Sequence, residues 1–236
     1  MHRHILAIGG CPQEGDWIRF VRFMAKLTGK RTPRLAVLPT AGGDAEHSIS
    51  MAKQWASQVP VQLDVISLFR REHEQLRPAI LKADAIFVGG GNTVNMLAIW
   101  RAHGVDHVLK EAYHSGVVLG GVSAGMICWF QAGMTDSYLK NNSAPIRDGL
   151  GLLPGSACPH FDSEHHRRPA YLAAIAGGFP NGIAADDRCG VLYRDEQIAE
   201  VITTTPSAKA YRITKAKSDQ QIEPLDTKLL PPLDTA

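Results

Sequence analysis

Two hydrophobic periods alternate through the first half of the chain. Short apolar runs of strand length are separated by longer segments whose apolar positions recur with helical spacing, a pattern typical of βαβ units around a parallel sheet. The predicted strands are 5–10, 35–38, 63–69 and 85–88, and the predicted helices are 16–28, 78–82, 93–101, 105–114 and one that begins at Asp44 or Ser48 and ends near 58. This half of the sequence therefore predicts an α/β fold.

Most of these strands end in glycine, at Gly9-Gly10, Gly42-Gly43 and Gly89-Gly90-Gly91. In an open α/β sheet the ligand site lies outside the carboxyl ends of the strands. Glycine also ends strands simply because it suits turns. Its repetition along one edge favours a functional edge there.

The pattern changes after residue 130. Residues 133–155 are rich in Gly, Asn, Asp and Pro and are predicted to be a loop, followed by a helix from 163 to about 176. Two strands are predicted at 190–193 and 198–203, with a turn at 194–196, and the polar tail 215–236 is expected to be partly mobile. Without an internal repeat or a clear linker, the sequence favours one domain over residues 1–236.

The segment Gly121-Val122-Ser123-Ala124-Gly125 follows the apolar run 117–119 and precedes the apolar segment 126–130, predicted as a helix. Strand, G-x-S-x-G and helix in this order form the pattern of a nucleophile elbow, in which a sharp turn exposes the serine hydroxyl. The alternative is a plain glycine-rich turn between a strand and a helix. The flanking elements favour Ser123 as a nucleophile.

A serine nucleophile needs a base, and His160 is the favoured one of ten histidines. Pro159 stiffens the backbone just before it, and the alternative is a histidine packed in a turn. The others are most simply solvated side chains. His103 and His107 have H-x-x-x-H spacing, but they lack the glutamate of a zinc helix and Gly104 weakens the helix between them. No metal or other cofactor is predicted.

The group that orients the histidine should be a carboxylate, and the spacing does not decide which one. The candidates are Asp136, Asp162, Glu164, Asp186 and Asp187.

Two backbone N–H groups should hold the oxyanion. One is expected from Ala124 and the other from Gly90 or Gly91, since a glycine run lets the backbone approach a substrate closely. A phosphate-binding loop is the weaker reading because 89–92 fits neither nucleotide-binding glycine pattern.

Taken together, 89–93 (Gly-Gly-Gly-Asn-Thr), the elbow around Ser123 and 159–161 (Pro-His-Phe) make the chain resemble the peptidase E family of alpha-aspartyl dipeptidases, related to cyanophycinase. The resemblance spans about 5–201. It implies a three-layer, doubly wound, mostly parallel α/β fold of the class I glutamine-amidotransferase type, with Ser123 as nucleophile and His160 as base. It also implies Asp136 as the third member of the triad, with Glu164 in reserve.

The same resemblance implies a dipeptide that begins with aspartate, whose carboxylate needs a cation. Arg167 and Arg168 are candidates by position, and their alternative is a solvated helix face. Asn92 and Thr93 are further candidates for substrate binding. The leading hypothesis is a serine dipeptidase. The alternatives are a hydrolase or transferase acting on another small amide, ester or aspartyl polymer, and a non-catalytic binding protein on the same fold.

Composition limits the classes of binding partner and the cellular compartment that we expect for this protein. A hydrophobic content of 44%, a charged content of 20% and a net charge of +2 without a basic stripe argue against nucleic acid. Four scattered cysteines suit a reduced chain, and no apolar run approaches the length of a membrane span. We expect a soluble cytoplasmic protein, with a homodimer implied by the resemblance.

Overall fold

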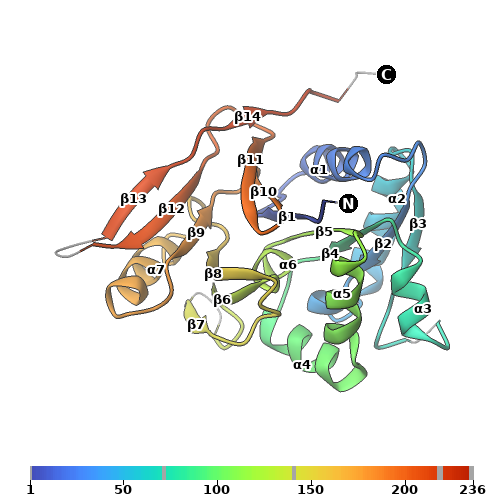
Figure 1. Cartoon of the computed structure of the whole chain (residues 1–236), viewed down its shortest axis with the longest axis horizontal. Helices are drawn as coiled ribbons and strands as arrows, with labels where there is room; N and C mark the ends of the chain where they lie inside the picture. The colour runs from blue at the N-terminus through green and yellow to red at the C-terminus, as the bar shows by residue number, and fades with distance from the viewer. Residues whose placement is uncertain (1, 71–72, 140–141, 217–219, 234–236) are drawn as a thin grey trace.

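The structure is a computed structural model that describes residues 2–70, 73–139, 142–216 and 220–233 (Figure 1). Its helices are α1 Glu14–Leu27, η1 Thr40–Gly42 (a 3-10 turn), α2 Glu46–Ala56, α3 Leu76–Leu81, α4 Thr93–His103, α5 Val105–His114, α6 Ala124–Ile127 and α7 Arg167–Ala176. Its strands are β1 His4–Ile8, β2 Arg34–Leu38, β3 Gln62–Val65, β4 Ala85–Val88, β5 Val118–Val122, β6 Phe130–Thr135, β7 Ala144–Ile146, β8 Leu153–Cys158, β9 Gly182–Ala185, β10 Cys189–Arg194, β11 Gln197–Thr203, β12 Ala210–Lys215, β13 Gln220–Pro224 and β14 Lys228–Leu229.

A large sheet forms the centre of the molecule, with the strand order β14-β11-β10-β1-β5-β4-β2-β3. The run from β1 to β3 is parallel, whereas β10 pairs antiparallel with β1 and β11 antiparallel with β10. The parallel strands are those predicted from the βα pattern, and β4 and α5 have the predicted bounds. β1 therefore lies between β5, which is parallel to it, and β10, which is antiparallel to it and comes later in the sequence.

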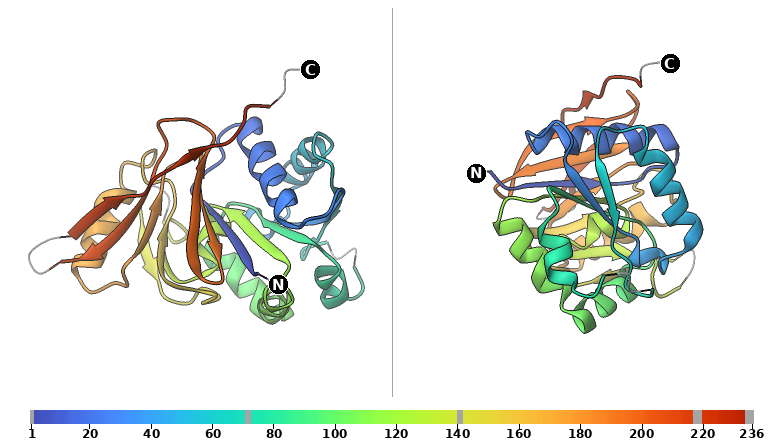
Figure 2. Two further views of the ribbon diagram at one scale, coloured as in Figure 1. Left: turned by 45° about the horizontal axis from the view of Figure 1, so that its top comes forward. Right: turned by 90° about the vertical axis from the view of Figure 1, so that its right-hand side faces the viewer.

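Alternate residues of each parallel strand face opposite layers of helices. Leu35 and Val37 of β2 join the hydrophobic cluster beneath α1 and α2, whereas Ala36 and Leu38 join the cluster beneath α3, α4 and α5. The sheet is thus covered on both faces (Figure 2), which is why its strands are apolar at nearly every position.

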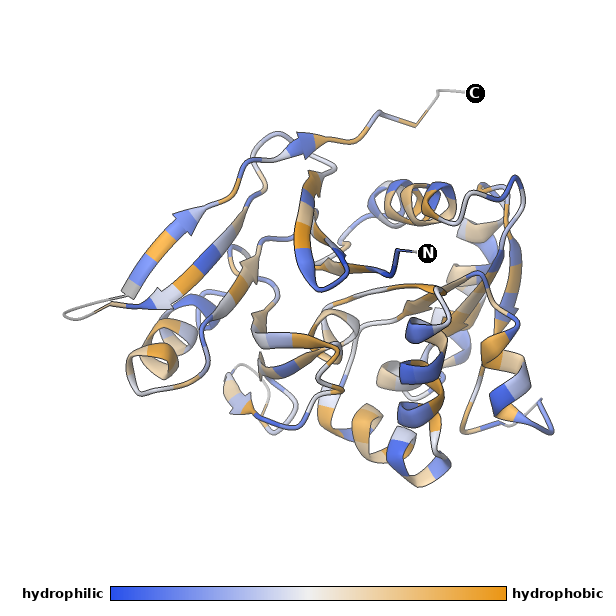
Figure 3. Cartoon of the chain, viewed as in Figure 1, coloured by the Kyte–Doolittle hydropathy of each residue, from blue (hydrophilic) through white to orange (hydrophobic). Residues whose placement is uncertain are grey.

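A second sheet has the order β13-β12-β9-β8-β6-β7, and α7 packs on it. Along β12 and β13 hydrophobic residues are flanked by hydrophilic ones (Figure 3), and Ile213 of β12 lies in the cluster beneath α7. One hydrophobic core cluster contains Ile86 of the large sheet together with Ala157 and Ala210 of the second. The two sheets therefore share a core.

The predicted loop at 133–155 is wrong, because β6, β7 and β8 lie in this stretch and build half of the second sheet. Pro145 occupies the edge strand β7, where a missing N–H is tolerated, and Gly155 has φ +80 inside β8. The predicted helix 126–130 is also shorter than expected. α6 ends at Ile127, and Phe130 already begins β6.

Asp44 and Ser48 do not cap α2, which starts at Glu46 after Ala45. Asp44 Oδ2 instead accepts hydrogen bonds from Ser67 Oγ and from the backbone N–H groups of Leu68 and Phe69. These bonds draw residues 67–69 out of the ladder, so β3 ends at Val65 rather than at the predicted 69.

The remaining differences lie at the ends of elements and in the tail. α7 begins at 167, four residues later than predicted, and the polar tail forms β13 and β14 within its described part. Residues 217–219 and 234–236 of that tail lie outside the described residues. No helix in the described ranges is long and apolar enough to cross a membrane.

Candidate active site

Ser123 stands at a strained turn between β5 and α6. Its backbone has φ +57 and ψ −109, a region that non-glycine residues rarely adopt and that costs on the order of 1–3 kcal/mol. The Ser123 N–H donates to the Ile8 carbonyl at 3.0 Å, and the helix that follows is a single turn. These are the features of a nucleophile elbow.

The two glycines of the elbow are required by the end of β4. A Cβ on Gly125 would lie 2.3 Å from the Val88 carbonyl oxygen, and one on Gly121 would lie 2.6 Å from the same atom. Larger residues cannot fit without moving the backbone. The pattern around Ser123 therefore follows from close packing of the elbow against the neighbouring strand.

The loop after β4 lies against the serine. A Cβ on Gly90 would be 3.4 Å from Ser123 Cβ, and Gly91, with φ +136, approaches Ala41 so closely that its own Cβ would lie 2.2 Å from the Ala41 carbonyl oxygen. Within the described ranges, the N–H groups of Gly90, Gly91 and Ala124 donate to no protein acceptor. They are thus available to an oxyanion beside Ser123.

His160 follows β8 and is paired with a carboxylate from the turn after β9. Its Nδ1 lies 2.6 Å from Asp187 Oδ1, and both side chains are about one-fifth exposed. His160 has φ +53, and the next residue, Phe161, is buried and donates its N–H to the Ala185 carbonyl. With Nδ1 bonded to Asp187, Nε2 is the nitrogen left to act as a base.

Gly10 joins this pair to the elbow. A Cβ at Gly10 would lie 1.8 Å from Asp187 Oδ1 and 3.0 Å from His160 Nδ1, and the Arg188 N–H donates to the Gly10 carbonyl. The Ser123 N–H is bonded to Ile8, and the His160–Asp187 pair lies against Gly10. Ile8 and Gly10 are two residues apart in one extended segment, which corresponds to about 7 Å. Ser123 and His160 share no hydrogen bond within the described part of the chain; such bonds often tighten only with substrate.

The two neighbouring carboxylates in the turn after β9 differ in their electrostatics. Burial would raise the pKa of Asp187, but the hydrogen bond and charge of His160 outweigh it, with help from Ser163 and Arg188, so that this pKa is lowered. Burial raises the pKa of Asp186 to about 6, although that carboxyl also accepts the Lys209 N–H. Asp187 is therefore the one of the two held as a carboxylate against the histidine.

The structure does not bring Asp136 or Glu164 to the histidine ring. Asp136 Oδ1 lies 3.2 Å from Arg167 Nη2, and Glu164 Oε2 lies 2.5 Å from Arg167 Nε. A buried guanidinium needs such partners, and it draws both carboxylates away from His160. The carboxylate that lies at His160 Nδ1 is Asp187, which differs from the expected position of Asp136 or Glu164.

Arg167 itself is buried, with a side chain 2% exposed, and it also donates to the Met134 carbonyl. Its charge is neutralised within the protein, which does not fit the predicted role toward a substrate carboxylate. Arg168 is exposed, and its guanidinium carbon lies 5.2 Å from the centre of the Phe161 ring.

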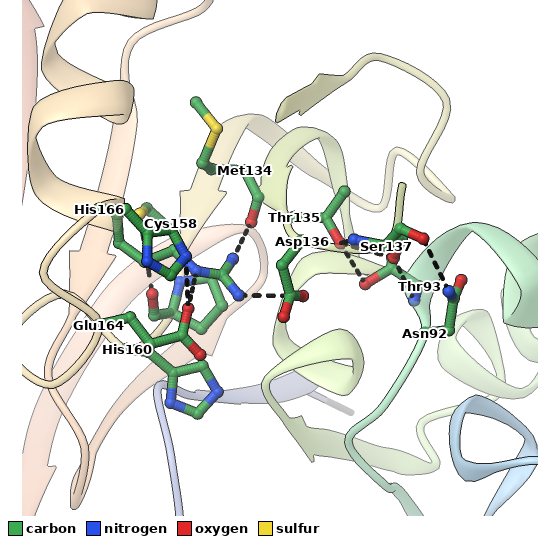
Figure 4. Close-up of polar contacts among 12 residues, drawn as sticks. Asn92, Thr93, Met134, Thr135, Asp136, Ser137, Cys158, His160, Glu164 and His166 are labelled. Atoms are coloured by element: carbon green, nitrogen blue, oxygen red, sulfur yellow. Dashed lines mark hydrogen bonds and ion pairs between the residues drawn. The ribbon is translucent and has the colours of Figure 1, made fainter. Parts of the chain in front are cut away.

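Asn92 and Thr93 form hydrogen bonds with other residues of the protein. Asn92 Oδ1 caps α4 by accepting from the Asn95 N–H, and Asn92 Nδ2 donates to the Ser137 carbonyl. Thr93 is buried, and its N–H donates to Ser137 Oγ (Figure 4). Ser137 thus binds the start of α4, directly after the glycine run 89–91, a contact that the sequence does not indicate.

The histidine pair His103 and His107 gathers no further ligands. Across the residues that the structure describes, no group of three or more His, Cys, Asp or Glu side chains is placed to hold a metal ion.

The sequence alone leaves Asp187 as one of several candidate carboxylates and indicates Gly10 only as part of a strand end. The signal for Asp187 was a carboxylate at the end of a strand-like apolar run, but Asp186 carries the same signal. Two contacts between residues distant in the sequence separate them, the hydrogen bond of Asp187 with His160 and its bridge to Gly10.

The comparisons with known proteins agree with one another. A model of peptidase family S51 matches residues 5–201. The chain is 38% identical over 236 residues to the uncharacterized peptidase YgaJ of Bacillus subtilis (strain 168), covering 97% of this chain and 99% of that protein. It is 28% identical over 192 residues to Peptidase E of Pasteurella multocida (strain Pm70), covering 81% of this chain and 71% of that protein.

The fold is also found among solved structures. The crystal structure of a peptidase from an acI-B1 Actinobacterium superimposes with a TM-score of 0.72 at 16% identity, covering 94% of this chain and 95% of that one. This likeness confirms the predicted three-layer α/β fold.

Proposed function

Because this chain belongs to peptidase family S51, we propose that it is a serine-type peptidase with Ser123 as nucleophile, His160 as base and Asp187 as the group that orients the base. Family membership also confirms the resemblance to peptidase E predicted from the sequence, and with it peptidase as the class of protein. The observation that carries the proposed triad is the 2.6 Å contact between His160 and Asp187 at Gly10, beside the elbow.

The first half of the reaction forms an acyl-enzyme. His160 Nε2 takes the proton of Ser123 Oγ, which attacks the peptide carbonyl carbon and forms a bond to it. The negative charge that develops on the carbonyl oxygen is held by the N–H groups of Gly90 or Gly91 and Ala124. The C–N bond then breaks as His160 gives its proton to the leaving amine.

The second half releases the product. His160 takes a proton from water, whose oxygen attacks the acyl carbon, and the C–O bond to Ser123 breaks as the serine regains a proton. Asp187 stabilises the imidazolium in both halves. Its lowered pKa supports this role, because the carboxylate stays ionised at neutral pH.

The substrate proposed here is a short peptide, with a dipeptide beginning with aspartate as the leading choice. The Peptidase E relatives support it. Arg168 is the exposed arginine beside the histidine segment, and we assign it the aspartyl carboxylate. The neutralised charge of Arg167 favours a second candidate, hydrolysis of other small amides without an acidic side chain.

Labelling with a fluorophosphonate tests the nucleophile directly. We expect the wild type to form an adduct on the peptide that contains Ser123, and Ser123→Ala to lose both the adduct and the hydrolysis of Asp-Leu and other dipeptides. Ser115→Ala, on the exposed turn after α5, should keep both. Labelling that survives Ser123→Ala, or an absence of both labelling and hydrolysis in the wild type, contradicts the proposal.

We also propose that residues 1–236 form a single domain. The core cluster shared by the two sheets supports this, since the nucleophile comes from one sheet and the base from the other. A fixed distance between them requires that the sheets move as one body.

A further inference from the structure

An apolar cavity of about 160 Å³ lies directly beside the elbow. Its walls come from the carboxyl ends of the parallel strands and from α1 and α2, and they include Trp17, Met51, Trp55, Phe87, Val122 and Gly90. The cavity therefore lies at the same sheet edge as Ser123, on the face covered by α1 and α2.

Two of the lining residues also belong to the proposed catalytic machinery. Gly90 offers an N–H group to the oxyanion, and Val122 immediately precedes Ser123. A side chain that enters the cavity is then attached to a backbone within reach of the nucleophile. This continuity distinguishes the cavity from the grooves beside β3, whose lining contains no residue of the elbow or of the oxyanion loop.

The chemistry of the cavity excludes a charged occupant. None of the described residues that line it carries a charge, and burial raises the pKa of the lining Cys11 thiol well above its ordinary value, which keeps it neutral. An ionised carboxylate placed here would lose its hydration without gaining a partner. An apolar group gains free energy in proportion to the area that it removes from water.

Size and shape limit the occupant further. A cavity of about 150 Å³ with apolar walls is large enough for benzene, so a space of this size suits a leucine, methionine or phenylalanine side chain. Its aromatic walls are packed against one another, with ring centroids 5.7 Å apart for Trp17 and Trp55 and 5.5 Å apart for Trp17 and Phe87. Such a wall is preorganised, which lowers the cost of binding.

We propose that this cavity binds an apolar side chain of the peptide substrate, carried by one of the two residues that flank the scissile bond. The proposal rests on the proposed peptidase function. It assigns the substrate class as short peptides with a leucine-, methionine- or phenylalanine-sized residue at that position. An aspartate, if the substrate carries one, occupies the other position.

Two sets of dipeptides distinguish the two positions. Leu-Ala, Met-Ala and Phe-Ala are compared with Ala-Ala and Asp-Ala for the residue that donates the carbonyl, and Ala-Leu and Asp-Leu with Ala-Ala and Asp-Ala for the leaving residue. In one set we expect kcat/KM to rise about 10-fold or more from alanine to leucine, the discrimination typical of an apolar pocket. Equal rates for leucine and alanine at both positions overturn the proposal.

Variants of α2 residues test whether the cavity causes the preference for leucine over alanine. Ser48→Trp adds bulk from a half-buried lining position and should lower kcat/KM for leucine about 10-fold while changing that for alanine little. Met51→Ala enlarges the cavity and should shift the preference toward phenylalanine. The matched control Ser50→Trp lies on an exposed position of the same helix and should leave the profile unchanged.

Opposite shifts from the filling and the enlarging variant cannot arise from loss of stability alone. If Ser48→Trp and Ser50→Trp change the profile equally, the cavity is not the binding site. Labelling of Ser123 by a fluorophosphonate, measured in parallel, distinguishes failure of this inference from failure of the proposed function. An enzyme that is labelled but has no apolar preference contradicts only this inference. An unlabelled enzyme contradicts the proposed function.

Discussion

The two sides of the proposed catalytic centre are held in place by opposite means. On the nucleophile side, Gly121 and Gly125 lie in close contact with backbone atoms of β4, and Gly91 with those of Ala41, with no charged side chain involved. On the base side, His160 and its neighbours are held by paired charges, in which Asp187 and Arg167 each take part. One side is determined by shape and the other by electrostatics.

This difference predicts different sensitivities. Added atoms should damage the nucleophile side most, because the space next to Gly91, Gly121 and Gly125 is already filled by backbone atoms. Removed or neutralised charges should damage the base side most, because each leaves a partner unpaired. Four changes test this division.

The largest effect is expected from Asp187→Asn. The amide cannot hold the imidazole in the required tautomer or stabilise its positive charge, so kcat/KM should fall by about 10⁴-fold. The matched control is Asp136→Asn, which changes a half-exposed ion pair with Arg167 and should cost less than about 10-fold. Steady-state kinetics on one dipeptide measures both, and a larger loss from the Asp136 variant would return the third place in the triad to Asp136.

Arg167→Met should cause the largest loss of stability on the base side. Removing the buried cation leaves Glu164 and Asp136 without their partner, and breaking such a pair costs about 3–5 kcal/mol. Arg168→Met, at the exposed neighbour stacked on Phe161, should cost about 1 kcal/mol or less. Urea unfolding followed by circular dichroism measures the free energy of each variant; equal losses would show that the buried charge network does not stabilise this side.

Gly10→Ala tests the contact between the two sides. The added Cβ would overlap Asp187 Oδ1 and displace the pair from the elbow, and a displacement of about 1 Å costs about 10²-fold in rate. Gly15→Ala in α1 is the control, because its Cβ would meet only Leu233 Cδ1 at 3.6 Å and alanine favours a helix by about 0.5–1 kcal/mol. The idea fails if Gly10→Ala keeps full activity.

The smallest effect is expected from Asp186→Asn, and it depends on pH. The folded-state pKa of Asp186 is raised to about 6, above its ordinary value, so the ionised carboxyl destabilises the folded protein relative to the unfolded chain. The variant should be more stable than the wild type at pH 7–8, and the difference should vanish below pH ~4, where both states of the wild type bind the proton. Thermal unfolding across pH, with the exposed Asp226→Asn as control, would contradict this if the gain persisted in acid.

The nucleophile side could be predicted from the sequence because its signals are local. Glycines on both sides of Ser123, an apolar strand before it and the glycine run 89–91 all lie within short windows. Gly91, Gly121 and Gly125 each have a close backbone contact that requires glycine. The parallel strands were predictable for the same reason, since each is followed by its own helix.

The base side could not be predicted to the same extent, because its contacts join distant residues. β6 to β8 are short, contain proline and glycine, and are stabilised by pairing across the second sheet rather than by local propensity. The choice of Asp187 over Asp136 depends on where Arg167 lies, since that guanidinium binds Asp136. Histidine, arginine and carboxylate were all visible in the sequence, but their pairing was not.

The position of β1 between β5 and β10 also determines the order in which the two sides of the proposed centre are synthesised. A ribosome makes the chain from its N-terminus, so β1 and the elbow emerge well before 187–194 are synthesised. Until then the proposed centre has a nucleophile but no oriented base. Peptidase activity should therefore be absent from the growing chain until residues 187–194 have been synthesised.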